Sequence, residues 1–163
     1  MNPAVIFDNG SGLFKAGLGD DDSPRVMFPT IIGKPKNPSL MVGMDQKDSY
    51  VGKEADEKRP LLYISNPIQH GHIMDWEAME KIWSHTYENE LVVDATEHPI
   101  MLTEPPANAK ADRVKLMQTF FETYNVNHFN LSVGNYFSNF PIKPKIQALC
   151  FPYTRPAGPL QLW

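Results

Sequence analysis

The feature that most restricts the fold of this chain is a short apolar run that stops at a glycine-rich turn. The run Ala4-Val5-Ile6-Phe7 is followed by Asp8-Asn9-Gly10-Ser11-Gly12, and apolar residues then recur from Leu13 to Leu18. Asn-Gly and Ser-Gly pairs supply the positive φ angles that a tight hairpin needs. The sequence therefore predicts a strand, a turn and a returning strand at the start of the chain.

Further short segments have the composition of strands. They are Val26 to Phe28, Thr30 to Gly33, Leu61 to Ile64 and Pro99 to Thr103. Between Lys34 and Tyr50 the prolines, the glycine and the apolar centre favour a long projecting loop over a regular element.

Two segments have the apolar spacing of amphipathic helices. The first follows Asp75, whose carboxylate can cap the first free amides, and its apolar residues are Trp76, Met79, Ile82, Trp83 and Tyr87. The second runs from about Ala109 to Tyr124 with Asn108 as the expected cap, and its predicted buried face is Val114, Met117, Phe120, Phe121 and Tyr124. The order of strands and helices predicts an α/β domain that carries a small β-rich insertion.

Composition narrows the classes of function. The chain has 163 residues, a net charge of −4 and a sequence pI near 5.7, and its lysines and arginines are scattered among a larger number of acids. This balance argues against a nucleic-acid partner, and the absence of a long apolar run argues against membrane insertion. The lone Cys150 favours a reducing, cytoplasmic setting. The histidines and this cysteine show no close metal-ligand spacing, so we expect no zinc site.

The charge and proline content change near residue 126. Residues 1–125 hold all 19 acids and 12 basic residues, a charge of −7, whereas residues 126–163 hold Lys143, Lys145 and Arg155 and no acid. The same tail carries five of the 15 prolines and shows no sustained periodicity. The sequence therefore predicts that residues 127–163 form a poorly structured tail.

The residues from Asp8 to Lys15 have the chemistry of a phosphate site. A hairpin turn with two glycines lets successive backbone N–H groups point at one spot, and such a nest binds phosphate oxygens. The cradle would be formed by Gly10, Ser11, Gly12 and Leu13, with Ser11 adding a hydroxyl donor. Lys15 would supply positive charge, and Asp8 could hold Mg²⁺ through its waters. On spacing alone, Asn-Gly-Ser-Gly as a simple tight hairpin is the competing interpretation.

Several segments, beginning with Asp8 to Lys15, closely resemble the actin family. The resemblance continues in order and spacing through Phe28-Pro29, Met41 to Gly52, Pro67-Ile68-Gln69-His70-Gly71, Met79 to Trp83, Leu102-Thr103-Glu104 and Phe121 to Asn125. It covers about residues 4–126 without an evident gap. Motifs of this length are specific, so the first 126 residues are identified as the start of an actin or a close actin-related protein.

The resemblance implies an actin-like ATPase fold of the ribonuclease H type, present only in part. Subdomain 1 would comprise residues 1–29 and 67–126, and subdomain 2 would comprise residues 30–66 with a DNase-binding loop at about 35–50. ATP and Mg²⁺ are the implied cofactors, with weak or absent binding expected in this chain. The histidine that the family methylates near the γ-phosphate would be His70, and nothing local marks it as catalytic.

The projecting loop would be an interaction site. In filaments of the family this loop inserts into the next protomer, and the apolar contacts that it would offer are Leu40, Met41, Val42 and Met44. Ordinary loop residues are the alternative interpretation, although an exposed apolar cluster between polar residues usually marks a contact surface. Asp45 stands where the family has glycine, and its carboxylate could stiffen or repel that contact.

The chain also departs from the family pattern. Gly134 would align with the glutamine that orients the attacking water, and the second phosphate hairpin and the adenosine pocket have no counterpart in the 163 residues. We expect a truncated form that arises by splicing or frameshift, hydrolyses ATP poorly, and leaves parts of Trp76, Trp83, Phe120 and Phe121 uncovered.

Three classes of function remain open. The first is an actin-like cytoskeletal protein with a partial ATP and Mg²⁺ phosphate-binding site. The second is a non-enzymatic fragment that binds actin, actin-binding proteins or a folding chaperone. The third is another ATPase with an acid-Gly-Ser/Thr-Gly hairpin, such as a sugar kinase or a heat-shock chaperone, and the long match from Met41 to Gly52 argues against it.

Overall fold

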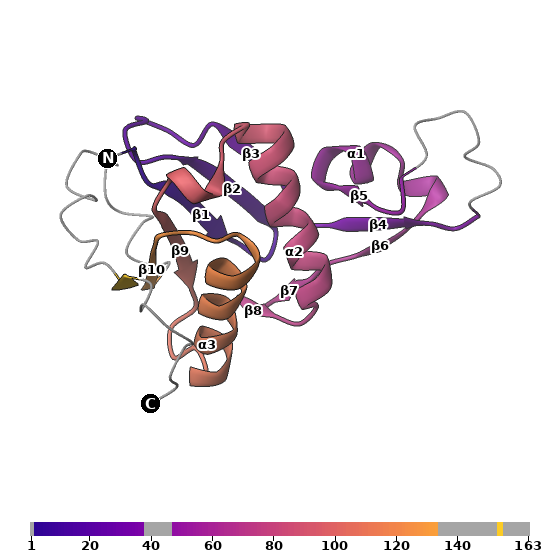
Figure 1. The fold of residues 1–163 in the computed structure, drawn as a ribbon. Coiled ribbons are helices and arrows are strands. Elements are labelled where there is room, and N and C mark those ends of the chain that lie inside the picture. The colour runs from indigo at the N-terminus through magenta and orange to yellow at the C-terminus, as the bar shows by residue number, and fades with distance from the viewer. Residues whose placement is uncertain (1, 38–46, 134–152, 155–163) are drawn as a thin grey trace. The chain divides into compact units, whose positions relative to one another are not determined.

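The computed structural model describes residues 2–37, 47–133 and 153–154 (Figure 1). The chain divides into two units. Unit 1 contains residues 1–7, 17–23 and 94–163, and unit 2 contains residues 8–16 and 24–93. A six-stranded sheet has the strand order β11-β10-β9-β1-β2-β3. Two smaller sheets have the orders β5-β4-β6 and β7-β8.

Unit 1 is built on parallel strands joined by a helical crossover. Its elements are the first residues of β1 (Val5–Asn9), η4 (Ala95–Glu97), β9 (Ile100–Glu104), α3 (Lys110–Gln118), η5 (Thr119–Thr123), β10 (His128–Val133) and β11 (Tyr153–Thr154). β1 and β10 both run parallel to β9, and β11 runs antiparallel to β10. β9 is paired with a neighbouring strand on both sides, and its five residues are all buried, as is typical of a central strand in the parallel part of a sheet.

An aromatic cluster fills the space between α3–η5 and the strands of unit 1. Phe120 lies 6.4 Å from Phe7 and 5.7 Å from Phe129 between ring centroids. Phe121 lies 5.9 Å from Phe129. Aromatic pairs at these separations add to the burial of apolar area, so this cluster is the core of unit 1.

Unit 2 combines a two-stranded segment, a small sheet and a long helix. Its elements are most of β2 (Leu13–Leu18), β3 (Val26–Pro29), β4 (Ile32–Pro35), β5 (Tyr50–Val51), α1 (Gly52–Glu57), η2 (Arg59–Leu61), β6 (Leu62–Ser65), β7 (Ile68–Gln69), β8 (His72–Ile73), α2 (Trp76–His85) and η3 (Thr86–Leu91). Ile31, Tyr50, Ala55 and Leu62 form a buried cluster between the small sheet and α1.

Gly52 starts α1 at a position where only glycine fits. Its φ is +58°, and an added Cβ would lie 2.5 Å from Cδ2 of Phe28. The absence of a side chain at Gly52 therefore lets α1 pack directly on β3.

Most predicted elements are confirmed, with shifts of one or two residues at their ends. The predicted strand Leu13–Leu18 is β2, and the other predicted strands correspond to β1, β3, β4, β6 and β9. Asp75 caps α2 as predicted, because its Oδ1 accepts a hydrogen bond from the N–H of Ala78 at 3.0 Å. Helix α1 and the β7–β8 hairpin were not predicted.

The predicted cap of the second helix is wrong. Ala109 occupies the N-cap position of α3 and makes no side-chain cap bond. The amide of Asn108 instead donates to Glu104 Oε2 at 3.1 Å, and Arg113 donates to the same oxygen at 2.8 Å. A buried carboxylate needs such donors, and this requirement outweighs capping.

Two expectations about the surface and the tail are also wrong. Four aromatic side chains were expected to be partly uncovered. Trp76 is only partly buried, as expected, but Trp83, Phe120 and Phe121 are buried. The predicted buried face of the second helix is also partly wrong, because Leu116 is buried on α3, whereas Val114, Met117 and Tyr124 are only partly buried.

Residues 128–133 form β10, so the predicted unstructured tail does not begin at residue 127. Phe129 anchors this strand because it packs on the aromatic core.

Candidate phosphate-binding site

The predicted site residues from Asp8 to Lys15 lie together at the β1–β2 turn, within unit 2. Lys15 Nζ lies 3.3 Å from Asp8 Oδ2, and both side chains are partly exposed. The ammonium and the carboxylate therefore stand side by side at the surface, where both can reach a ligand.

Gly10 gives the turn its shape because it has no Cβ, and not through a positive φ angle. The sequence predicted positive φ angles at the glycines of this turn, and that prediction is wrong, since neither Gly10 nor Gly12 has one. Its N–H donates to the carbonyl oxygen of Asp8 at 2.9 Å, and an added Cβ would lie 2.3 Å from the carbonyl oxygen of Leu13. The contact is with backbone, which cannot move aside as a flexible side chain could. Any residue with a Cβ at position 10 would therefore displace the turn.

Protein donors hold the three consecutive carbonyl groups of the turn. Thr30 Oγ1 donates to Gly10 O at 2.7 Å, and the N–H of Thr30 donates to Gly12 O at 3.1 Å. Between them, Asn66 Nδ2 donates to Ser11 O at 2.7 Å. In a trans peptide the C=O of one residue and the N–H of the next point in opposite directions. The N–H groups of Ser11, Gly12 and Leu13 therefore point away from the side of the turn on which Thr30 and Asn66 bind the carbonyl groups.

The hydroxyl of Ser11 is held by a second hairpin. β7 and β8 are joined by His70 and Gly71, whose φ angles of 51° and 85° are those of a two-residue turn. The N–H of Gly71 donates to Ser11 Oγ at 2.8 Å. Because the oxygen accepts this bond, the hydroxyl proton of Ser11 remains available to an acceptor outside the hairpin.

Helix α2 supports the end of β1. Trp83 is fully buried, and its Nε1 donates to Asn9 Oδ1 at 3.2 Å. The side chain of Asn9, which follows Asp8 in the chain, is therefore held by the buried core of unit 2.

Sequence reasoning missed Thr30, Asn66 and Gly71 as supports of the turn. Asn66 and Gly71 bond to Ser11 across 55 and 60 residues of chain, and no local pattern reports such contacts. The predicted interaction residues Leu40, Met41, Val42 and Met44 lie outside the described residues, as does Gly134.

Within residues 2–37, 47–133 and 153–154, no group of three or more His, Cys, Asp and Glu side chains could hold a metal ion. Over the same residues, every helix is too short or too polar to cross a membrane.

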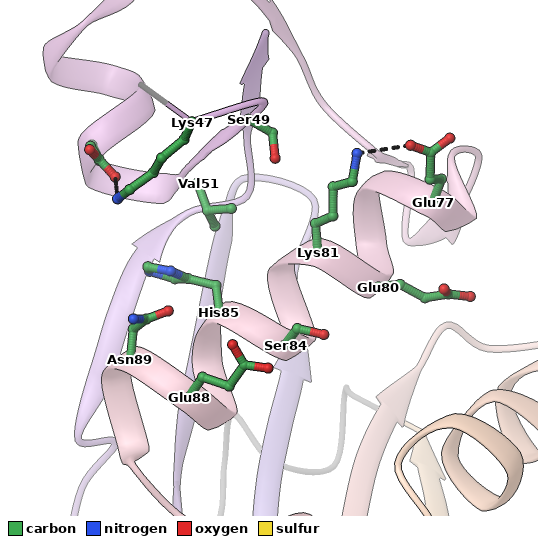
Figure 2. A pocket seen from close by; sticks show the side chains of 11 residues that line it. Lys47, Ser49, Val51, Glu77, Glu80, Lys81, Ser84, His85, Glu88 and Asn89 are labelled. Carbon is green, nitrogen blue, oxygen red and sulfur yellow. Dashed lines mark hydrogen bonds and ion pairs between the residues drawn. The ribbon is translucent and has the colours of Figure 1, made fainter. Parts of the chain in front are cut away.

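A separate pocket of about 430 Å³ lies in unit 2 between the β5–α1 segment and the α2–η3 helix (Figure 2). Its lining is polar and contains both charge signs. Lys81 reaches toward Glu77 at 2.8 Å, and Lys47 lies 2.8 Å from Glu54 (Figure 2). The two lysines of this pocket are therefore already paired with carboxylates of its own wall.

Glu54 is expected to make stability depend on pH in the acid range. Burial raises the pKa of this carboxyl, but hydrogen bonds from Lys47 and Lys58, both at 2.8 Å, outweigh burial, so the pKa is lowered from 4.5. The resulting stabilisation is complete above the unfolded pKa and is lost as pH falls through the lower folded pKa. Urea unfolding should therefore show wild type up to about 1 kcal/mol more stable than Glu54→Gln at neutral pH.

This difference should shrink as the pH falls below 4.5, the ordinary pKa of the group. Glu57→Gln, an exposed position in the same helix, is the matched control and should leave the free energy of unfolding at neutral pH unchanged. A difference for Glu54→Gln that stays constant from neutral to strongly acid pH would contradict this assignment.

A family model described as Actin matches residues 1–144 of the 163-residue chain. The match extends beyond residue 126, where the motif-by-motif resemblance was expected to stop. It includes both strands and the whole turn of the candidate site, together with α2, α3 and β10. The α/β class is confirmed, and the chain belongs to the actin family.

Proposed function

We propose that this chain is an actin-like cytoskeletal protein of the cytoplasm whose β1–β2 hairpin binds the phosphates of ATP together with Mg²⁺. The observation that carries the proposal is the anchoring of three consecutive carbonyl groups by Thr30 and Asn66. Among the described residues, the N–H groups of Ser11 and Gly12 donate to no protein acceptor. An outward row of N–H groups beside a lysine suits a phosphate chain.

Each side chain of the hairpin has a distinct role in this proposal. Lys15 supplies a positive charge to the phosphates, and the Ser11 hydroxyl donates one hydrogen bond. Asp8 holds Mg²⁺ through the water molecules of the ion, and a single carboxylate is sufficient because Mg²⁺ keeps most of its water. When bound, Mg²⁺ neutralises phosphate charge.

Binding without rapid hydrolysis is part of the proposal. Phosphoryl transfer to water requires a residue that orients the attacking water. By resemblance that position is Gly134, which has no side chain to do so and which lies outside the described residues. We therefore expect the rate at which ADP forms from Mg²⁺–ATP to be no higher with the chain present than in buffer alone.

Calorimetric titration of the purified 163-residue chain with Mg²⁺–ATP tests the proposal. One cradling hairpin with one lysine should give a dissociation constant of roughly 0.1 to 1 mM. Lys15→Ala should weaken binding by about tenfold or more, because a bond to a charged group is lost.

Lys36→Ala is the matched control, since Lys36 lies elsewhere in unit 2 and donates to Pro60 O at 3.1 Å. It should bind Mg²⁺–ATP as the wild type does. Equal affinities for Lys15→Ala and wild type would overturn the assignment of the hairpin.

A further inference from the structure

The amide of Asn66 joins the β1–β2 turn to the segment that leads into β7. Its Nδ2 donates to Ser11 O at 2.7 Å, and its Oδ1 accepts from the N–H of Ile68 at 3.0 Å. The reversed amide would place oxygen against a carbonyl oxygen and nitrogen against an N–H group, so the donor and acceptor roles are fixed by chemistry.

The segment around Asn66 is itself rigidly held. Asn66, Pro67 and Ile68 form a turn in which a side-chain oxygen bonds the backbone two residues on, and proline restricts the middle position. The carbonyl oxygen of Pro67 accepts from the N–H of Met74 at 2.8 Å, just before α2. The amide of Asn66 is therefore presented to Ser11 from a fixed support.

The bond from Asn66 decides the direction of one particular donor. Ser11 C=O and Gly12 N–H belong to the same trans peptide and point in opposite directions. Holding Ser11 O on the Asn66 side turns the Gly12 N–H to the other side. Thr30 fixes the peptides before and after this one, so Asn66 is the described residue that fixes the middle peptide.

We propose that Asn66 is a positioning residue for phosphate binding, which orients the Gly12 N–H by holding the carbonyl of Ser11. This inference rests on the proposed function of the hairpin. It also predicts that loss of the Asn66 bond loosens the contact between the Gly71 N–H and Ser11 Oγ, because both bonds hold the same residue.

Two substitutions remove the bond to Ser11 and keep the turn. Asn66→Asp retains an oxygen that can accept from Ile68 but places a carboxylate against Ser11 O. Asn66→Ser retains a hydroxyl acceptor for the turn, is too short to reach Ser11, and adds no charge. Both should weaken Mg²⁺–ATP binding about threefold to tenfold, the loss expected for one hydrogen bond.

Asn127→Asp is the matched control. Asn127 is an exposed amide in unit 1 that donates to the carbonyl oxygen of Thr96 at 2.7 Å, the same kind of bond as that of Asn66. Its loss should lower the melting temperature as much as Asn66→Asp does, and should leave the affinity for Mg²⁺–ATP unchanged.

Amide hydrogen exchange without nucleotide separates positioning from nucleotide binding. The Gly71 amide should exchange several times faster in both Asn66 variants than in the wild type or Asn127→Asp. Wild-type exchange at Gly71 in both variants would overturn the inference, as would wild-type affinity for Mg²⁺–ATP in both. If the wild type binds no Mg²⁺–ATP, the proposed function fails and the role of Asn66 toward phosphate fails with it. The exchange result then shows whether Asn66 orders the turn at all.

Discussion

Replacing Gly10 by alanine is expected to reduce Mg²⁺–ATP affinity by at least tenfold and to destabilise unit 2. The new Cβ would lie 2.3 Å from the carbonyl oxygen of Leu13, so the backbone of the turn has to move. Forcing an extra carbon into a packed position costs about 1 to 3 kcal/mol. A displaced turn also breaks the alignment of the N–H groups on which phosphate binding depends. Titration calorimetry and urea unfolding of the variant measure the two effects.

Gly12→Ala is the control for stability at the same turn. An added Cβ at Gly12 meets no atom within 4 Å, and its φ is not in the left-handed region. The free energy of unfolding should therefore stay within about 1 kcal/mol of the wild type. Equal stability of the two alanine variants would show that the turn does not have the conformation described above.

Replacing Trp83 by alanine is expected to cause the largest loss of stability in the chain. The indole is fully buried in unit 2, and its Nε1 donates to Asn9 Oδ1. Truncation of a buried tryptophan costs about 3 to 5 kcal/mol, a large share of the 5 to 15 kcal/mol that holds a typical domain folded. Urea unfolding followed by far-ultraviolet circular dichroism should show a much lower midpoint.

Trp76→Ala is the matched comparison, because Trp76 lies in the same helix and is only partly buried. Its truncation should cost about 1 to 2 kcal/mol, in proportion to the smaller area removed from water. Similar losses of unfolding free energy for both variants would mean that the side chain of Trp83 is partly exposed, as the sequence predicted.

The sequence predicted the part of the candidate site that lies on one continuous segment of the chain. The residues from Asp8 to Lys15 form one turn, and their glycines and charges can be interpreted without knowledge of the rest of the chain. The supports of the turn come from Thr30, Asn66 and Gly71, which are distant in sequence. Their side-chain and backbone donors become recognisable only when the fold brings them to the turn.

The N-cap residue was predicted correctly for α2 and incorrectly for α3. Asp75 precedes α2, and its Oδ1 accepts a hydrogen bond from the N–H of Ala78 as expected. Asn108 lies near Glu104, a buried carboxylate that binds its amide. A local propensity therefore failed where a buried charge required donors.

The predicted start of the tail at residue 127 was wrong for a related reason. Prolines and the absence of acids suggested a tail without structure, yet β10 forms because Phe129 completes the aromatic core of unit 1 and both neighbouring strands supply ladder partners. The division into actin-like subdomains at residues 30 and 66 stays a prediction.

Amide spectra of the ¹⁵N-labelled chain, recorded with and without Mg²⁺–ATP, show directly whether the N–H groups of the hairpin bind phosphate. We expect the amide resonances of Ser11, Gly12 and Leu13 to shift on addition of Mg²⁺–ATP and to stay in place with adenosine, which lacks phosphates. If these three resonances stay in place at millimolar Mg²⁺–ATP while others move, the nucleotide binds elsewhere and the hairpin is not the phosphate site.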